Sequence, residues 1–141
     1  MIRRSIFFFS SSLLLACCLT APLARPQGDA SIEQFWGKFK TAVIKGDKEA
    51  VTSMTQFPVT MPYGVPPVRN KAQLLKRYRE VFNHEADAAR CFAKAKPETD
   101  PKRKHEFTIG CDNGSGQEVI VYTFTLTKLG WRLRGFDNIN E

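Results

Sequence analysis

Apolar and polar positions alternate through the last third of the chain, from His105 to Asn138. Segments with this period of two that are rich in β-branched and aromatic residues are typical of half-buried β-strands. We therefore expect three consecutive antiparallel strands, over residues 105–111, 117–129 and 131–138. The face expected to be buried carries Phe107, Ile109, Cys111, Ile120, Tyr122, Phe124, Leu126 and Leu133.

The turn between the first two strands is predicted at Asp112–Gly116, whose residues tolerate positive φ. A loop of about four or five residues there sets Ile109 opposite Ile120 and Phe107 opposite Tyr122. In this register the apolar sides of both strands coincide, which a random pairing would seldom achieve.

The turn after Leu129 determines which residues of the last two strands face each other. If Lys128 and Trp131 flank this turn, the inward pairs are Leu126 with Leu133, Phe124 with Gly135, and Tyr122 with Asp137. A phenol beside a carboxylate suits general acid/base chemistry, so Tyr122 and Asp137 are candidate catalytic residues. The competing interpretation is a structural hydrogen bond between the two side chains.

Apolar residues recur at helical spacing from Ser31 to Gly46, and again after Asp47. Ser31 and Gln34 have the spacing of a capping box, and Gly46 is expected to end the first helix. The apolar stripe of that helix consists of Ile32, Phe35, Trp36, Phe39 and Val43. A stripe at this spacing favours core packing over the alternative, a ligand box built on Trp36 and the phenylalanines.

A proline-rich stretch follows the second helix. The segment Phe57–Thr60 suits a sheet edge, because Pro58 cannot donate a hydrogen bond to a neighbouring strand. The segment Met61–Pro67 is either a rigid connector or a lid with Tyr63 pointing into a pocket, and we favour the connector.

A third amphipathic segment begins at Asn70, where Gln73 completes a capping box, and is expected to continue as a helix to Asn83. Its apolar side contains Leu74, Leu75, Tyr78, Val81 and Phe82. Residues 84–95 are rich in alanine, which favours another short helix, with a strand as the alternative. In the helical case Cys91 faces the sheet near Cys111.

The segment Met1–Ala24 has the pattern of a signal peptide, with Arg3 and Arg4 before an apolar core that is shorter than a membrane span. Two processing routes compete. In one, Cys17 follows a lipobox-like sequence and becomes a lipidated first residue; in the other, ordinary cleavage follows an alanine. We expect a linker over residues 25–30 and one domain over residues 31–141, in a protein that is exported to the periplasm or lipid-anchored in a bacterial envelope.

The exported domain is basic and contains two cysteines, Cys91 and Cys111. Without Arg3 and Arg4 the chain has 19 basic and 14 acidic residues, a net charge of +5. The basic cluster at 94–104 indicates either an anionic partner, such as a lipid headgroup, a polysaccharide or nucleic acid, or a solvated loop. Because no aromatic residues are interleaved for base stacking, we favour the loop and expect no nucleic-acid partner. In an oxidising compartment two lone thiols usually pair, so we predict a Cys91–Cys111 disulfide. No zinc spacing, phosphate loop or nucleophile elbow occurs, and we expect no metal or cofactor.

The order of these elements resembles the nuclear transport factor 2-like superfamily, and in particular its small exported bacterial members. The residues that carry the resemblance are Phe39–Asp47, Phe57–Pro58, Leu74–Phe82 and Gly130–Asp137. It implies an α+β, cone-shaped domain in which N-terminal helices pack on a strongly curved antiparallel sheet with a pocket between them. The residues expected to line that pocket are Trp36, Phe39, Tyr63, Tyr78, Phe107, Tyr122, Phe124 and Asp137.

Members of this superfamily include enzymes and binding proteins, so the fold does not determine the function. We expect a non-catalytic domain that holds a small apolar molecule or an envelope protein, with homodimerisation through the sheet face as an option and membrane contact only through a lipid anchor. One alternative is a cofactor-free isomerase or dehydratase that uses Tyr122 and Asp137. A second alternative is a toxin-neutralising immunity-type protein.

Overall fold

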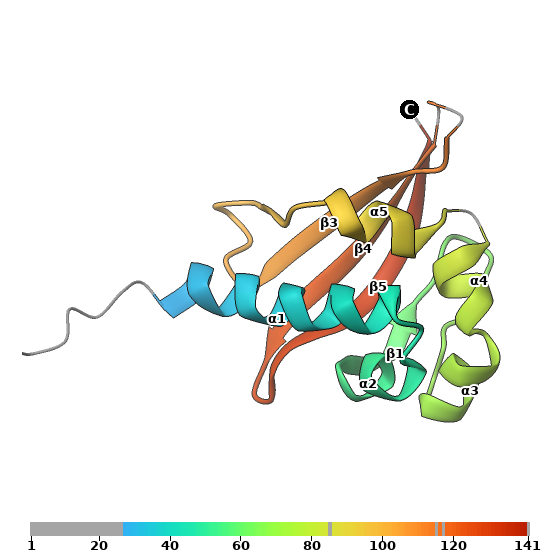
Figure 1. The fold of residues 1–141 in the computed structure, drawn as a ribbon, viewed down its shortest axis with the longest axis horizontal. Coiled ribbons are helices and arrows are strands. Elements are labelled where there is room, and N and C mark those ends of the chain that lie inside the picture. The colour runs from blue at the N-terminus through green and yellow to red at the C-terminus, as the bar shows by residue number, and fades with distance from the viewer. Residues whose placement is uncertain (1–26, 85, 115, 117, 141) are drawn as a thin grey trace, which may run out of the picture.

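A computed structural model describes residues 27–140 except residues 85, 115 and 117. Figure 1 shows helices packed against a twisted sheet. The helices are α1 (Gln27–Ile44), α2 (Lys48–Ser53), α3 (Lys71–Lys76), α4 (Tyr78–Asn83) and α5 (Ala88–Lys94), and the strands are β1 (Thr55–Thr60), β2 (Glu98–Thr99), β3 (Glu106–Asp112), β4 (Glu118–Thr127) and β5 (Gly130–Asn140). Among the described residues, no helix has the length and apolar character needed to cross a membrane.

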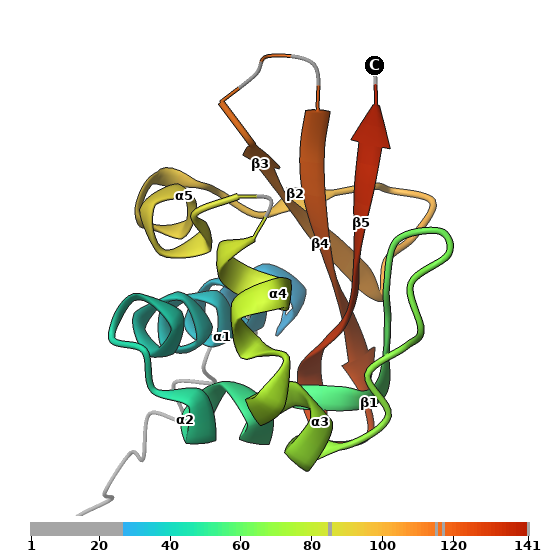
Figure 2. The same ribbon diagram turned by 90° about the vertical axis from the view of Figure 1, so that its right-hand side faces the viewer.

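The sheet has the strand order β1-β5-β4-β3-β2. Strand β1 is parallel to β5, and the other neighbours are antiparallel. Figure 2 shows α1, α4 and α5 on one side of this sheet. The predicted α+β class, with helices on a curved and mainly antiparallel sheet, is therefore confirmed, and the Phe57–Pro58 segment lies in the edge strand β1, as expected.

Strands β3 and β4 bury the predicted faces except at Leu126, which is 42% exposed near the end of β4, and their register differs from the prediction. Ile109 pairs with Tyr122 rather than Ile120, and Phe107 pairs with Phe124 rather than Tyr122. The pairing stops at Asp112 and Val119, so the connecting loop is longer than expected. A shift of two residues keeps each side chain on its predicted face, which explains why the apolar pattern alone could not detect it.

The second predicted register also differs, already before a β-bulge in β5, because Leu126 pairs with Trp131 rather than with Leu133. Phe124 pairs with Leu133 and Thr123 pairs with Gly135, which leaves Arg134 as the extra residue on β5. Beyond the bulge, Tyr122 pairs with Phe136, so Phe136 faces inward. Glycine is required at position 135 because a Cβ atom there would collide with Thr60 Oγ1 of β1.

The helices follow the capping signals with two differences. The N-caps Asp47 and Asn70 each accept a backbone hydrogen bond at 3.0 Å, as the sequence indicated. However, α1 begins at Gln27, so Ser31 lies inside it rather than at its start. The helix predicted from Asn70 is divided into α3 and α4 at Arg77, whose Nη1 donates to the carbonyl of Pro66 at 2.8 Å. For residues 84–95, the helix favoured over a strand is confirmed by α5 (Ala88–Lys94).

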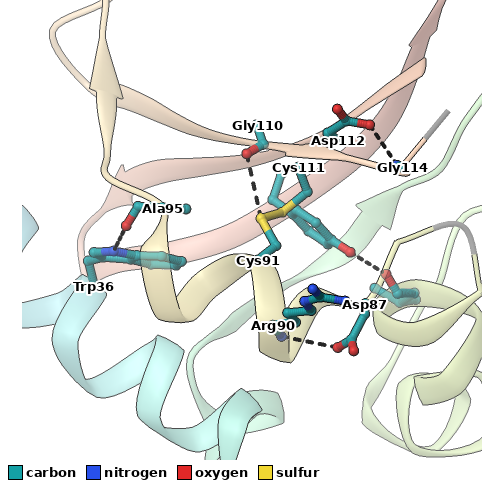
Figure 3. The surroundings of a disulfide bond; sticks show 11 residues. Trp36, Asp87, Arg90, Cys91, Ala95, Gly110, Cys111, Asp112 and Gly114 are labelled. Atoms are coloured by element: carbon teal, nitrogen blue, oxygen red, sulfur yellow. Dashed lines mark hydrogen bonds between the residues drawn. A yellow bond between two sulfur atoms is a disulfide. The ribbon is translucent and has the colours of Figure 1, made fainter. Parts of the chain in front are cut away.

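The predicted Cys91–Cys111 disulfide joins α5 to β3, with a Cα–Cα distance of 5.7 Å (Figure 3). Its sulfur atoms lie at the edge of the core that fills the space between the helices and the sheet. The largest fully buried side chains of that core include Phe39, Leu74, Phe82, Phe92, Phe107, Ile109, Ile120, Tyr122, Phe124 and Leu133.

Candidate functional site

The space in which a pocket was expected contains a packed aromatic cluster. Six of the predicted pocket residues lie in it, each with at most 5% of its surface exposed: Trp36, Phe39, Tyr78, Phe107, Tyr122 and Phe124. Phe124 contacts Phe39 edge-on with 4.9 Å between ring centroids and stacks on Phe107 at 4.7 Å. Because aromatic rings at these distances are in contact, the cluster forms the interior of the fold.

The predicted inward pair of Tyr122 and Asp137 is wrong. The Tyr122 hydroxyl is buried and donates a hydrogen bond of 2.9 Å to the Val81 carbonyl. Asp137 pairs with Val121 on the outer face and is exposed, because the bulge at Arg134 shifts the end of β5 by one residue. The candidate acid and base therefore lie on opposite sides of the sheet.

Tyr63 also lies away from the interior. Its side chain is fully exposed, at 104% of the reference area, in the loop between β1 and α3. The structure thus places Tyr63 on the surface of a connector and not over a pocket.

Tyr78 is buried among the helices, and within the described part of the chain its hydroxyl has no hydrogen-bond partner. Burial, followed by the negative charge of Asp47, raises the pKa of Tyr78 from its ordinary value of 10.0 to about 12. Lys48 lies over the Tyr78 ring, with Nζ 5.3 Å from the centroid, a distance at which a cation interacts favourably with an aromatic face. The neutral phenol is therefore the form present at physiological pH.

A groove of about 590 Å³ lies outside this core, between α1 and the chain that leaves α5. Its floor is the edge of Trp36, whose indole Nε1 donates a hydrogen bond of 3.3 Å to the Ala95 carbonyl (Figure 3). We call it the α1 groove, and it is lined by Ile32, Glu33, Trp36, Gly37, Lys40, Ala95, Lys96, Pro97 and Thr99.

Gly37 lies in the middle of α1 and opens the α1 groove. A Cβ atom at this position would have nothing within 4 Å, so no packing inside the protein requires a glycine here. Glycine in a helix interior costs about 1 kcal/mol relative to alanine. An exposed backbone at the floor of a groove is the arrangement expected where another molecule approaches closely.

Gly37 and Lys40 were not predicted as binding residues from the sequence, whereas Lys96 belongs to the basic cluster at 94–104 that was interpreted as a solvated loop. A lone glycine within an otherwise regular helical stripe was the signal that could have indicated the site. The lysines gave no such signal, because nothing in their local pattern distinguishes them from the other basic residues.

Two further features complete the description of candidate sites. No group of three or more His, Cys, Asp or Glu side chains among the described residues could hold a metal ion. Cys17, the predicted lipidation site, lies outside the described residues.

Comparison with known proteins identifies a fold. A ketosteroid isomerase-like protein from Erwinia carotovora atroseptica matches with a TM-score of 0.51 and 14% sequence identity, over 81% of this chain and 96% of that one. This chain has the nuclear transport factor 2-like fold. A domain of unknown function with a cystatin-like fold from Nostoc punctiforme also matches this chain, with a TM-score of 0.50 and 10% identity, over 84% of this chain and 80% of that one.

The comparisons do not extend from fold to activity. Other structures similar to this nuclear transport factor 2-like chain have names that propose a dehydratase and an aromatic ring hydroxylase, with identities of 16% and 11%. No protein-family model matches the sequence, and no curated protein matches it. Function must therefore be argued from the residues of this chain.

Proposed function

We propose that this protein is an exported, non-catalytic binding domain that holds a small ligand in the α1 groove. One contrast carries the proposal: aromatic side chains fill the interior, whereas the groove is open above Trp36 and Gly37. Its volume of about 590 Å³ lies within the range of small-molecule sites. The mixture of apolar floor and charged rim is also typical of such sites.

The geometry does not favour the acid/base alternative. That hypothesis depended on Tyr122 and Asp137 facing each other, and the two residues lie on opposite faces of the sheet. A candidate general base must lie within hydrogen-bond reach of the proton that it removes, and Asp137, on the outer face of the sheet, does not meet this requirement for Tyr122.

The proposed location outside the cytoplasm rests on two features. The segment Met1–Ala24 has the pattern of a signal peptide, and Cys91 and Cys111 form a disulfide of the kind that persists in oxidising compartments. Cell fractionation with the intact mass of the mature protein tests this part. Recovery in the cytoplasm with an uncleaved leader and free thiols would contradict it.

The groove is tested by nuclear magnetic resonance with three probes of different charge: decanoate, decanol and decyltrimethylammonium. The readout is the indole N–H signal of Trp36, which is distinguished from that of Trp131 by a Trp131→Phe variant. Gly37→Met is the blocking variant, because Gly37 lines the groove, a Cβ atom there meets open space, and methionine is a better helix former than glycine. Gln34→Met is the matched control, since Gln34 is exposed on the same helix and does not line the groove.

We expect at least one probe to shift the Trp36 signal in the wild type and in Gln34→Met, and none to shift it in Gly37→Met. Thermal unfolding should show that Gly37→Met is at least as stable as the wild type, so that lost binding cannot be attributed to unfolding. The proposal fails if no probe shifts the Trp36 signal, or if Gly37→Met binds as the wild type does.

A further inference from the structure

We infer that the α1 groove selects an amphiphile with a carboxylate head and an alkyl chain of medium length. The head lies between Lys40 and Lys96, and the chain lies along the α1 wall toward Ile32. This inference rests on the proposed function, since it specifies the ligand of the same groove.

Two lysines and one glutamate line the groove, so the lining carries a net positive charge. Lys40 comes from α1 and Lys96 from the segment after α5, and both line the groove. Neither belongs to an ion pair within the part of the chain that the structure describes. Two ammonium groups from separate elements, each without a carboxylate partner, favour an anionic group placed between them.

Along the α1 wall of the groove, the acidic residue Glu33 lies apart from Lys40. The chain after Ala95 runs back along α1 toward the N-terminal end of that helix (Figure 1). Lys96 directly follows Ala95, whose carbonyl accepts the hydrogen bond from Trp36, so Lys96 lies beside the Trp36 turn of α1. Glu33 and Lys40 are seven residues apart on α1, about 10 Å along the helix axis, so a negative charge is repelled near Glu33 and attracted near Lys40.

The middle of the groove suits a hydrocarbon chain. Ile32 and Trp36 form an apolar floor that belongs to the core, and Pro97 forms part of the opposite wall. At Gly37 no side chain interrupts the floor. The aliphatic stems of Lys40 and Lys96 extend this apolar surface while their charged ends stay in water.

The length of the groove limits the length of the ligand. Its α1 wall extends from Ile32 to Lys40, which at the helical rise per residue is about 12 Å. An alkyl chain of this length is close to that of decanoate, whereas a much longer chain would leave its end in water. The ligand class is thus a single-chain carboxylate and not a lipid with two long chains.

The test compares the dissociation constants of three compounds that share one alkyl chain: decanoate, decanol and decyltrimethylammonium. We expect decanoate to bind about tenfold more tightly than decanol, because both lysines contribute to its binding. Decyltrimethylammonium should bind least, since its charge is repelled by the lysines. Among carboxylates, hexanoate should bind more weakly than decanoate, and hexadecanoate should gain little over decanoate.

Charge-matched variants assign the effect to the two lysines. Lys40→Ala and Lys96→Ala should each weaken decanoate binding about threefold, and the double variant roughly tenfold. Decanol binding should weaken less, because decanol loses only contact with the aliphatic stems. Lys38→Ala and Lys94→Ala remove the same charge from neighbouring exposed positions that do not line the groove, and each should change binding by less than about twofold.

The outcomes separate this inference from the proposed function. If decanol binds as tightly as decanoate and the groove lysines have no more effect than Lys38 and Lys94, the carboxylate assignment is overturned while the groove stands as a binding site. If decyltrimethylammonium binds best, Glu33 selects the ligand and the assignment is again wrong. If none of the compounds binds, both proposals fail.

Discussion

The inner and outer faces of α1 differ in how closely other residues pack against them. On the inner face, Phe39 is completely buried and contacts Phe124 at 4.9 Å. On the outer face, one or two residues away, Gly37 has open space above it and Lys40 lines the α1 groove. The same helix therefore closes the interior of the fold and supplies the wall of a site on its surface.

Because of this difference, a pocket between the helices and the sheet cannot be assumed for a cone-shaped fold. In this chain the interior is filled by large aromatic side chains, and their contacts stabilise the domain. Inner-face substitutions should change the free energy of unfolding, whereas groove substitutions should change binding. Four variants, each with its control, test the effect of inner-face residues on stability.

Phe39→Ala should have the largest effect. Removal of a fully buried phenylalanine typically lowers the free energy of unfolding by about 3–5 kcal/mol, because it leaves a cavity among Trp36, Phe82 and Phe124. Denaturant unfolding measures the change, and Lys38→Ala, on the exposed face, should stay within about 0.5 kcal/mol of the wild type. A loss below about 1 kcal/mol for Phe39→Ala would mean that the interior is not closely packed.

Removal of the disulfide by Cys91→Ala with Cys111→Ala should lower the free energy of unfolding by about 3 kcal/mol, since the bridge closes a loop with a sequence separation of 20. The same comparison made with a reducing agent on the wild-type protein provides the control. Equal stability of the oxidised wild type and the double variant would contradict the expected constraint on the unfolded chain.

Tyr122→Phe should lower the free energy of unfolding by about 1–2 kcal/mol, because the Val81 carbonyl loses a buried donor. Asp137→Asn should stay within about 0.5 kcal/mol, since Asp137 is exposed. The acid/base hypothesis instead predicts that both variants lower an enzymatic activity more than they lower the free energy of unfolding. Parallel unfolding and ligand-binding measurements on the two variants distinguish these cases.

Tyr78→Phe should have the smallest effect at neutral pH, between no change and a gain of about 1 kcal/mol, because the buried hydroxyl has no partner to lose. Its signature is the dependence of stability on pH. Burial raises the pKa of Tyr78 to about 12 in the folded state, so its contribution is fully present below pH 10 and is lost as the pH rises through 12.

Over that pH range the wild type should therefore lose more stability than Tyr78→Phe does. Tyr63→Phe is the control, because Tyr63 is fully exposed, and it should follow the wild type. Parallel curves for the wild type and Tyr78→Phe would show that Tyr78 ionises as easily in the folded protein as in the unfolded one.

Most of the architecture could be predicted from the sequence because it depends on local periodicity. The period of two in β3 and β4 identified the buried faces, and the caps Asp47 and Asn70 located the starts of two helices. The Cys91–Cys111 bridge followed from cysteine count and the expected compartment. Each of these signals lies within one segment or follows from the chemistry of one residue type.

The details that decided the site depend on contacts between distant segments. The bulge at Arg134 accompanies the close approach of Thr60 to Gly135, which the sequence of β5 alone does not indicate. That bulge moved Asp137 to the outer face and removed the candidate catalytic pair. Likewise, the α1 groove requires residues 95–99 beside α1, and only the folded chain brings Lys96 to the same groove as Lys40.

The most direct test of the binding site is a crystal structure of the protein grown with decanoate. We expect electron density for the ligand over Gly37 and Trp36, with its carboxylate between Lys40 and Lys96. Phe39 and Phe124 should still be in contact. Density for the ligand in the interior, among Phe39, Phe124 and Tyr122, would contradict it.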